Sequence, residues 1–120
     1  MDVGGQELIG IFLEDSTLET GEGNIALTGV SGSGTVGSNN AGILIQANST
    51  LTTTGGEITV TGTGGDSAGS LNLGMIIQQG STLQTTGAGG NITLIGTAGA
   101  GADELIGIVI DTGTLETGQG

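Results

Sequence analysis

The chain has 120 residues, of which 28 are glycine, 12 are acidic and none is lysine, arginine or histidine, so its formal charge is −12. Without a cationic side chain it has nothing with which to neutralise phosphates, which disfavours nucleic acid and anionic membrane surfaces as partners. Cysteine is absent, so disulfides do not hold the fold, and no apolar run approaches the roughly 20 residues of a membrane span. We therefore expect neither nucleic-acid binding nor membrane insertion.

The sequence repeats itself, because one kind of phrase recurs at spacings of 32, 32 and 33 residues. The phrases are Gly10-Ile-Phe-Leu, Gly42-Ile-Leu-Ile, Gly74-Met-Ile-Ile and Gly107-Ile-Val-Ile. A period of this length is typical of stacked structural units that share one core. The expected units are residues 10–41, 42–73 and 74–106, followed by a partial unit over 107–120.

Each unit contains three short runs in which apolar and polar residues alternate, as they do in a half-buried strand. In the second unit these runs are 42–46, 49–53 and 57–61. Successive side chains of a strand point to opposite faces, so the alternation assigns five apolar residues of each unit to the interior. The expected inward residues are Ile11, Leu13, Leu18, Ile25 and Leu27, then Ile43, Ile45, Leu51, Ile58 and Val60, then Met75, Ile77, Leu83, Ile92 and Leu94.

These features predict an all-β fold, a parallel β-helix or solenoid of about four coils, with 32–33 residues and three short strands in each coil. One coil cannot fold alone, because five buried apolar side chains contribute only about 8–15 kcal/mol against roughly 1–2 kcal/mol of backbone entropy for every ordered residue. The less regular segments 30–41 and 63–73 are expected to form one long loop per coil.

The sequence also has a longer period of three units, because residues 4–23 and 101–120 match at 12 of 20 positions. The residues of the first unit therefore recur after three units. We expect residues 1–120 to form a single solenoid segment that is a piece of a longer repetitive chain.

One predicted surface is unusually apolar. In the first run of each unit the outward positions are also apolar, and the glycines beside them are expected to leave a flat track without side chains. An apolar stripe on an otherwise acidic protein is typical of a contact surface, although a loop of the same chain folded over it is the alternative. The predicted interface residues are Phe12, Leu44, Ile76, Val109, Gly10, Gly42, Gly74 and Gly107.

The sequence predicts no catalytic site. Asp111-Thr112-Gly113 spells the aspartic-protease triplet, but the same repeat position holds Glu14, Gln46 and Gln78 in the other units, so Asp111 fits its repeat without a catalytic explanation. No histidine, cysteine or lysine is present to activate a serine or threonine nucleophile. We expect no enzyme activity and no cofactor.

Weak surface calcium binding is the alternative to plain solvation of the carboxylates at Glu14-Asp15, Asp103-Glu104 and Asp111.

The acids follow the three-unit period. The position after the first run holds Glu14, Gln46, Gln78 and Asp111, and the corresponding position of the second run holds Glu19, Thr52, Gln84 and Glu116. Like charges in adjacent coils would lie about 5 Å apart, whereas a three-coil interval places them roughly 14–15 Å apart, beyond the Debye length of about 8 Å. We expect the glutamines between them to hydrogen-bond along the ladder.

The phrases Gly-Ile-x-Ile, Ser-Thr-Leu-x-Thr-x-Gly-Gly and x-Ile-x-Val-Thr-Gly-x-Gly-Gly resemble the β-helical repeats of filamentous-haemagglutinin-type, two-partner-secretion exoproteins, notably the long cyanobacterial ones. The resemblance runs from Leu8 to Gly118. It implies a right-handed parallel β-helix, export through an outer-membrane partner and an adhesive or fibrous role outside the cell.

Fold and resemblance together predict a structural segment of an extracellular fibre or adhesin stalk, which associates with itself end to end or laterally. The alternative is a binding module whose loops recognise a glycan or a cell-surface partner. Aromatic platforms would favour that alternative, and the chain has a single aromatic residue, Phe12.

Overall fold

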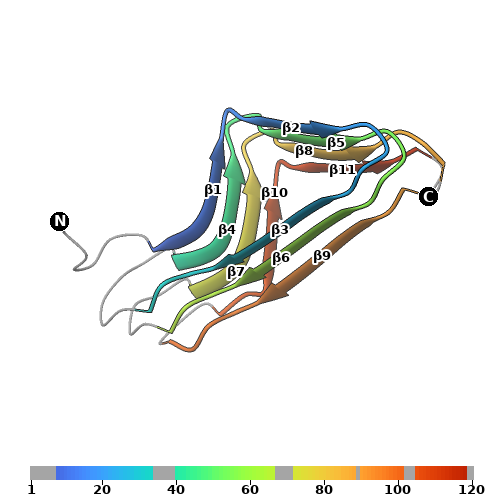
Figure 1. The fold of residues 1–120 in the computed structure, drawn as a ribbon. Coiled ribbons are helices and arrows are strands. Elements are labelled where there is room, and N and C mark those ends of the chain that lie inside the picture. Colours follow the sequence, from blue (N-terminus) through green and yellow to red (C-terminus); the bar gives the residue numbers. More distant parts are fainter. Residues whose placement is uncertain (1–7, 34–39, 67–71, 89, 102–104, 119–120) are drawn as a thin grey trace.

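The computed structural model describes residues 8–33, 40–66, 72–88, 90–101 and 105–118, and it confirms the predicted parallel β-solenoid. Three parallel sheets form the walls of the coils (Figure 1). The first sheet contains β1 (Ile9–Glu14), β4 (Asn40–Gln46), β7 (Asn72–Gln78) and β10 (Ile108–Asp111). The second contains β2 (Thr17–Thr20), β5 (Thr50–Thr53), β8 (Thr82–Thr85) and β11 (Thr114–Thr117). The third contains β3 (Ile25–Val30), β6 (Ile58–Thr63) and β9 (Ile92–Thr97).

Each strand pairs in register with the equivalent strand one coil later. Ile11, Ile43, Met75 and Ile108 stack in the first sheet, and Leu18, Leu51, Leu83 and Leu115 stack in the second. The chain therefore winds once through all three sheets before it returns to lie beside itself. None of the described ranges holds a helix long and apolar enough to cross a membrane.

The core occupies the space between the three sheets and confirms the inward assignment. All fifteen expected inward residues belong to one apolar cluster, which Ile108 of the last coil joins. The side chains of the second coil are fully buried, whereas several of the first coil are only partly buried. The difference arises because a middle coil has a neighbour on both sides, and a terminal coil has a neighbour on one.

The fourth coil contributes two strands within the described residues, so the third sheet has one strand fewer than the others. Its inward side chains are consequently poorly covered. Ile110 is 45% exposed and Leu115 is 38% exposed, although the residues beneath them, Ile77 and Leu83, are fully buried. This end of the solenoid presents core residues to solvent.

Two buried asparagines link the coils where the first sheet begins. Asn40 and Asn72 are fully buried, and Nδ2 of Asn40 donates a hydrogen bond to Oδ1 of Asn72 at 2.9 Å. The Leu8 N–H donates to Oδ1 of Asn40 at 3.0 Å, and Nδ2 of Asn72 donates to the carbonyl oxygen of Ala100 at 2.9 Å. These bonds explain why β4 and β7 begin two residues before the glycines at which strands were expected. The central parts of the predicted long loops, 34–39 and 67–71, lie outside the described residues.

The turn between the first and second sheets exists in two lengths. The first and fourth coils use one residue with positive φ, Asp15 (φ 50°) and Thr112 (φ 58°). The second and third coils use two each, Ala47 with Asn48 and Gln79 with Gly80. The fourth coil thus repeats the turn of the first, as expected from the three-unit period of the sequence.

The glycines that open the units pack against the backbone of the third sheet. A Cβ atom at Gly42 would lie 2.3 Å from the Thr63 nitrogen, and one at Gly62 would lie 2.1 Å from the Gly74 oxygen. Both distances are too short for any side chain. The expected open track over Gly10, Gly42, Gly74 and Gly107 is therefore wrong, because at this corner two sheets approach so closely that only glycine fits.

We expect Gly62→Ala to lower the free energy of unfolding by about 1–3 kcal/mol, because the added methyl group must push two backbones apart. Gly21→Ala is the matched control, since a Cβ atom there meets nothing within 4 Å. Urea unfolding followed by circular dichroism measures both variants. Equal stability of the two variants would contradict the close packing at this corner.

Candidate functional site

The residues of the predicted apolar stripe lie in register across the first sheet, but only the first of them, Phe12, is exposed to solvent. Phe12 is 50% exposed, whereas Leu44 beside it is only 7% exposed. Ile76 and Val109 are half-buried. Leu44 is thus already covered by its own chain, and the stripe is not a continuous exposed surface. Its role as an interface stays a prediction.

A ladder of carboxylate and amide groups runs beside the stripe, where the first sheet ends. Nε2 of Gln46 donates a hydrogen bond to Oε1 of Glu14 at 3.1 Å, and Nε2 of Gln78 donates to Oε1 of Gln46 at 2.8 Å. Asp111 stands in register with Gln78 on the far side. The expected hydrogen bonding by glutamines between acids is confirmed.

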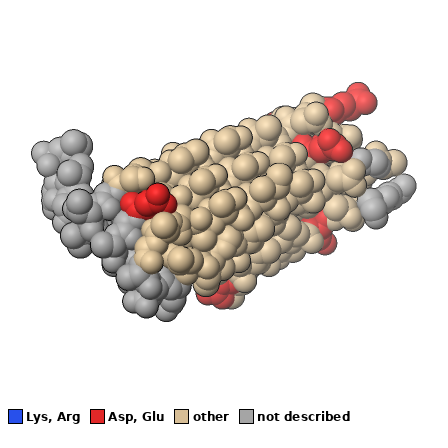
Figure 2. Space-filling view, turned by 90° about the horizontal axis from the view of Figure 1, so that it is seen from below, with Lys and Arg blue, Asp and Glu red and all other residues tan. Residues whose placement is uncertain are grey.

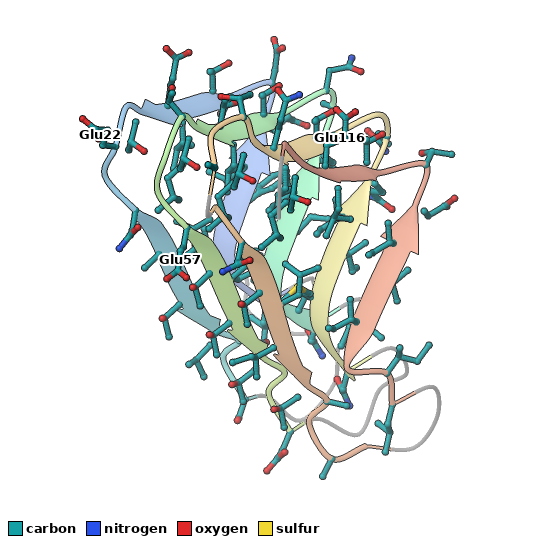
Figure 3. All side chains as sticks on the ribbon, turned by 90° about the vertical axis from the view of Figure 1, so that its right-hand side faces the viewer. Glu22, Glu57 and Glu116 are labelled. Carbon is teal, nitrogen blue, oxygen red and sulfur yellow. The ribbon has the colours of Figure 1, made fainter. Side chains whose placement is uncertain are left out.

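Other acids are also bonded to amides. Nε2 of Gln84 donates to Oε2 of Glu116 at 3.1 Å, and Nδ2 of Asn91 donates to Oε1 of Glu57 at 3.3 Å. Figure 3 shows Glu22 and Glu57 on successive coils near the turn into the third sheet, and Glu116 on β11. In the face drawn in Figure 2 the acidic side chains sit toward the margins of a broad uncharged area. The donors to Glu14, Glu57 and Glu116 are all neutral amides, since the sequence has no cation.

The candidate catalytic and metal residues are surface groups of the repeat. Asp111 ends β10 as an exposed residue, in the ladder position that Glu14 occupies in the first coil. Within the described ranges, no three His, Cys, Asp or Glu residues come together in a way that could hold a metal ion. The other acidic pair considered for calcium, Asp103 and Glu104, lies outside the described residues.

The last coil forms a second candidate surface. Exposed apolar side chains gather on the described part of this coil and just before it, at Leu105 (48%), Ile106 (40%), Ile110 (45%) and Leu115 (38%). Their equivalents in the first coil, Leu8, Ile9, Leu13 and Leu18, are half-buried. The alternation of the sequence assigns these positions in the same way in both coils, so the difference in exposure is visible only in the structure.

Searches of protein-family models, of curated proteins and of solved structures find no match to this chain. Its geometry is therefore the basis for assigning a function.

We expect Gln46→Glu to destabilise the fold by up to about 1 kcal/mol, because the new carboxylate lies beside Glu14 in the ladder and can no longer donate to it. Added salt should recover part of this loss, since it screens the two charges. The control is Ala88→Glu, which adds the same charge at an exposed turn residue. Urea titrations of both variants at low and high salt test the ladder, and identical salt responses would contradict it.

Proposed function

We propose that this chain is a structural, non-enzymatic segment of an extracellular fibre or adhesin stalk, and that it assembles with itself by stacking coils. The observation that carries the proposal is the parallel in-register pairing of equivalent strands in all three sheets, because each coil presents to its neighbour the same edges that the next coil uses. Unpaired strand edges beside exposed apolar side chains are templates for another chain. A parallel solenoid can extend by the same pairing that joins its own coils.

The composition supports a structural role. Glu14 and Glu116 accept hydrogen bonds from glutamines of neighbouring coils, and each of the first three coils contributes five apolar side chains to one core. The resemblance to filamentous-haemagglutinin-type exoproteins, with Gly42-Ile-Leu-Ile as one of its phrases, favours location outside the cell and export through an outer-membrane partner. Lateral contact through the exposed Phe12 is a secondary mode of association within the same proposal.

Association should depend on protein concentration and increase with salt. A formal charge of −12 on each copy opposes contact, and both added salt and acidification toward the isoelectric point near 4.1 weaken this repulsion. We expect light scattering and electron microscopy to show longer assemblies under both conditions. Calcium should act no better than sodium at equal ionic strength, because no clustered carboxylates within the described ranges form a metal site.

A monomer that is independent of concentration at every salt level would contradict the proposed function. A calcium effect far above that of sodium would instead indicate specific ion sites and would replace plain screening as the explanation.

A further inference from the structure

The outer face of the third sheet, which we call the threonine face, carries a regular array of side chains. Because β3, β6 and β9 pair in register, their outward residues form three columns of three. Most of these positions hold threonine, and two others hold the β-branched residues valine and isoleucine. The nine residues are Ala26, Thr28 and Val30 on β3, Thr59, Thr61 and Thr63 on β6, and Thr93, Ile95 and Thr97 on β9.

The threonine face is uncharged although the protein is strongly acidic. None of the residues of β3, β6 and β9 is acidic, whereas the whole sequence has 12 acids. Glu22 and Glu57 lie in the turns before β3 and β6, and Asp66 follows β6. The third sheet forms the lower side of the solenoid in Figure 1, and Figure 2, drawn from below, shows acids only toward the margins of this side. The face therefore presents hydroxyl and methyl groups to its surroundings.

The hydroxyls of the threonine face are not used within the described part of the chain. On the second sheet the threonine hydroxyls at the strand ends bond to the backbone. Oγ1 of Thr53 donates to the Gly56 carbonyl oxygen at 2.6 Å, and Oγ1 of Thr85 donates to the Gly90 carbonyl oxygen at 3.2 Å. The six threonine hydroxyls of the third sheet bond to no described residue, so each can donate one hydrogen bond and accept others from outside the protein.

The strand register fixes the spacing of this array in both directions. Neighbouring strands lie about 4.8 Å apart, and residues two apart along a strand lie about 6.6 Å apart. Oxygen atoms on the prism face of hexagonal ice form a rectangular array with similar repeats. We propose that the threonine face binds the surface of ice. Its hydroxyls join the hydrogen-bonded crystal surface, and its methyl groups lie in the spaces between the water molecules.

The size of the threonine face argues against a second copy of the chain as its occupant. Three strand spacings by the length of six residues give an area of roughly 300 Å². A stable protein–protein interface buries about 800 Å² on each partner. An ice surface is a partner of another kind, because it repeats at the spacing of the array and carries no charge. The two features that such a surface requires, regular spacing and neutrality, are those that the threonine face has.

The second sheet provides a comparison surface within the same molecule, because its array is interrupted. Its outward columns are Thr17, Thr50, Thr82 and Thr114 and, beside them, Glu19, Thr52, Gln84 and Glu116. The second of these columns contains two carboxylates and a long amide. These side chains extend beyond the threonines and add charge, so the second sheet is neither flat nor neutral.

Ice growth in a solution of the full chain tests the proposal, which goes beyond the structural role and does not depend on it. We expect a single ice crystal in this solution to melt and to freeze at different temperatures, and to grow with facets. We also expect the chain to concentrate in slowly grown ice, from which serum albumin is excluded as the control. Nanolitre osmometry measures the temperature gap, and absorbance measures the protein fraction in the ice.

Variants on two sheets locate the contact. Thr61→Tyr places a bulky ring at the centre of the threonine face while keeping a residue that favours strands, so the temperature gap should be lost. The matched control is Thr52→Tyr, because Thr52 is also a half-buried outward residue of the second coil but lies on the second sheet. This control should keep the gap. Circular dichroism confirms that both variants are folded.

A variant that completes the array should act in the opposite direction. Val30 is 61% exposed and Ile95 is 49% exposed, so Val30→Thr/Ile95→Thr adds two hydroxyls to the threonine face without opening the core. We expect this variant to widen the temperature gap. A gain of this kind does not arise from misfolding.

The outcomes separate ice binding from the other uses of this face and from the proposed function. Ice that grows and melts as in plain buffer, with both the unaltered chain and Val30→Thr/Ile95→Thr, would overturn the proposal. An equal loss of the gap in Thr61→Tyr and Thr52→Tyr would overturn the assignment to the threonine face. If Thr61→Tyr changes sedimentation and no variant affects ice, the face meets a second copy and ice binding is wrong. Light scattering above the freezing point reports self-association separately, so either proposal can fail while the other stands.

Discussion

Parallel in-register pairing is the constraint on which the rest of the structure depends. Each residue lies about 4.8 Å from its equivalent in the next coil, so every position must tolerate its own kind as a neighbour. Apolar positions satisfy this requirement by stacking into a continuous core, as Leu18, Leu51, Leu83 and Leu115 do. Asparagine does so by bonding its amide to the next amide, as Asn40 does to Asn72. Glycine stacks on glycine where the backbones of two sheets lie too close for a side chain, as at Gly42 and Gly62.

Acidic residues cannot satisfy this constraint by stacking on one another. With no cation in the chain, the acids are separated by neutral donors, so that Glu14 is followed by Gln46 and Gln78 before the next carboxylate at Asp111. Spacing of the charges thus accounts for a period longer than one coil. The same period makes the fourth coil resemble the first in sequence and in the turn between its first two strands.

Stability in such an array is shared between neighbours, because each coil is covered by the coils on either side. The second coil has both neighbours and a fully buried core, whereas the last described coil leaves Ile110 and Leu115 in solvent.

The sequence alone determined the solenoid, its coil length, its inward residues and the glutamine bonds between acids, because all of these follow from periodicity and from alternation along a strand. Tertiary structure decided what depends on contacts between sheets. In the sequence, Gly42 and Gly62 cannot be told apart from glycines that line an exposed surface. The structure shows that two backbones approach each other at these residues, so the lack of a side chain is needed for packing. Leu44 has the outward register of an exposed residue, yet its own chain covers it.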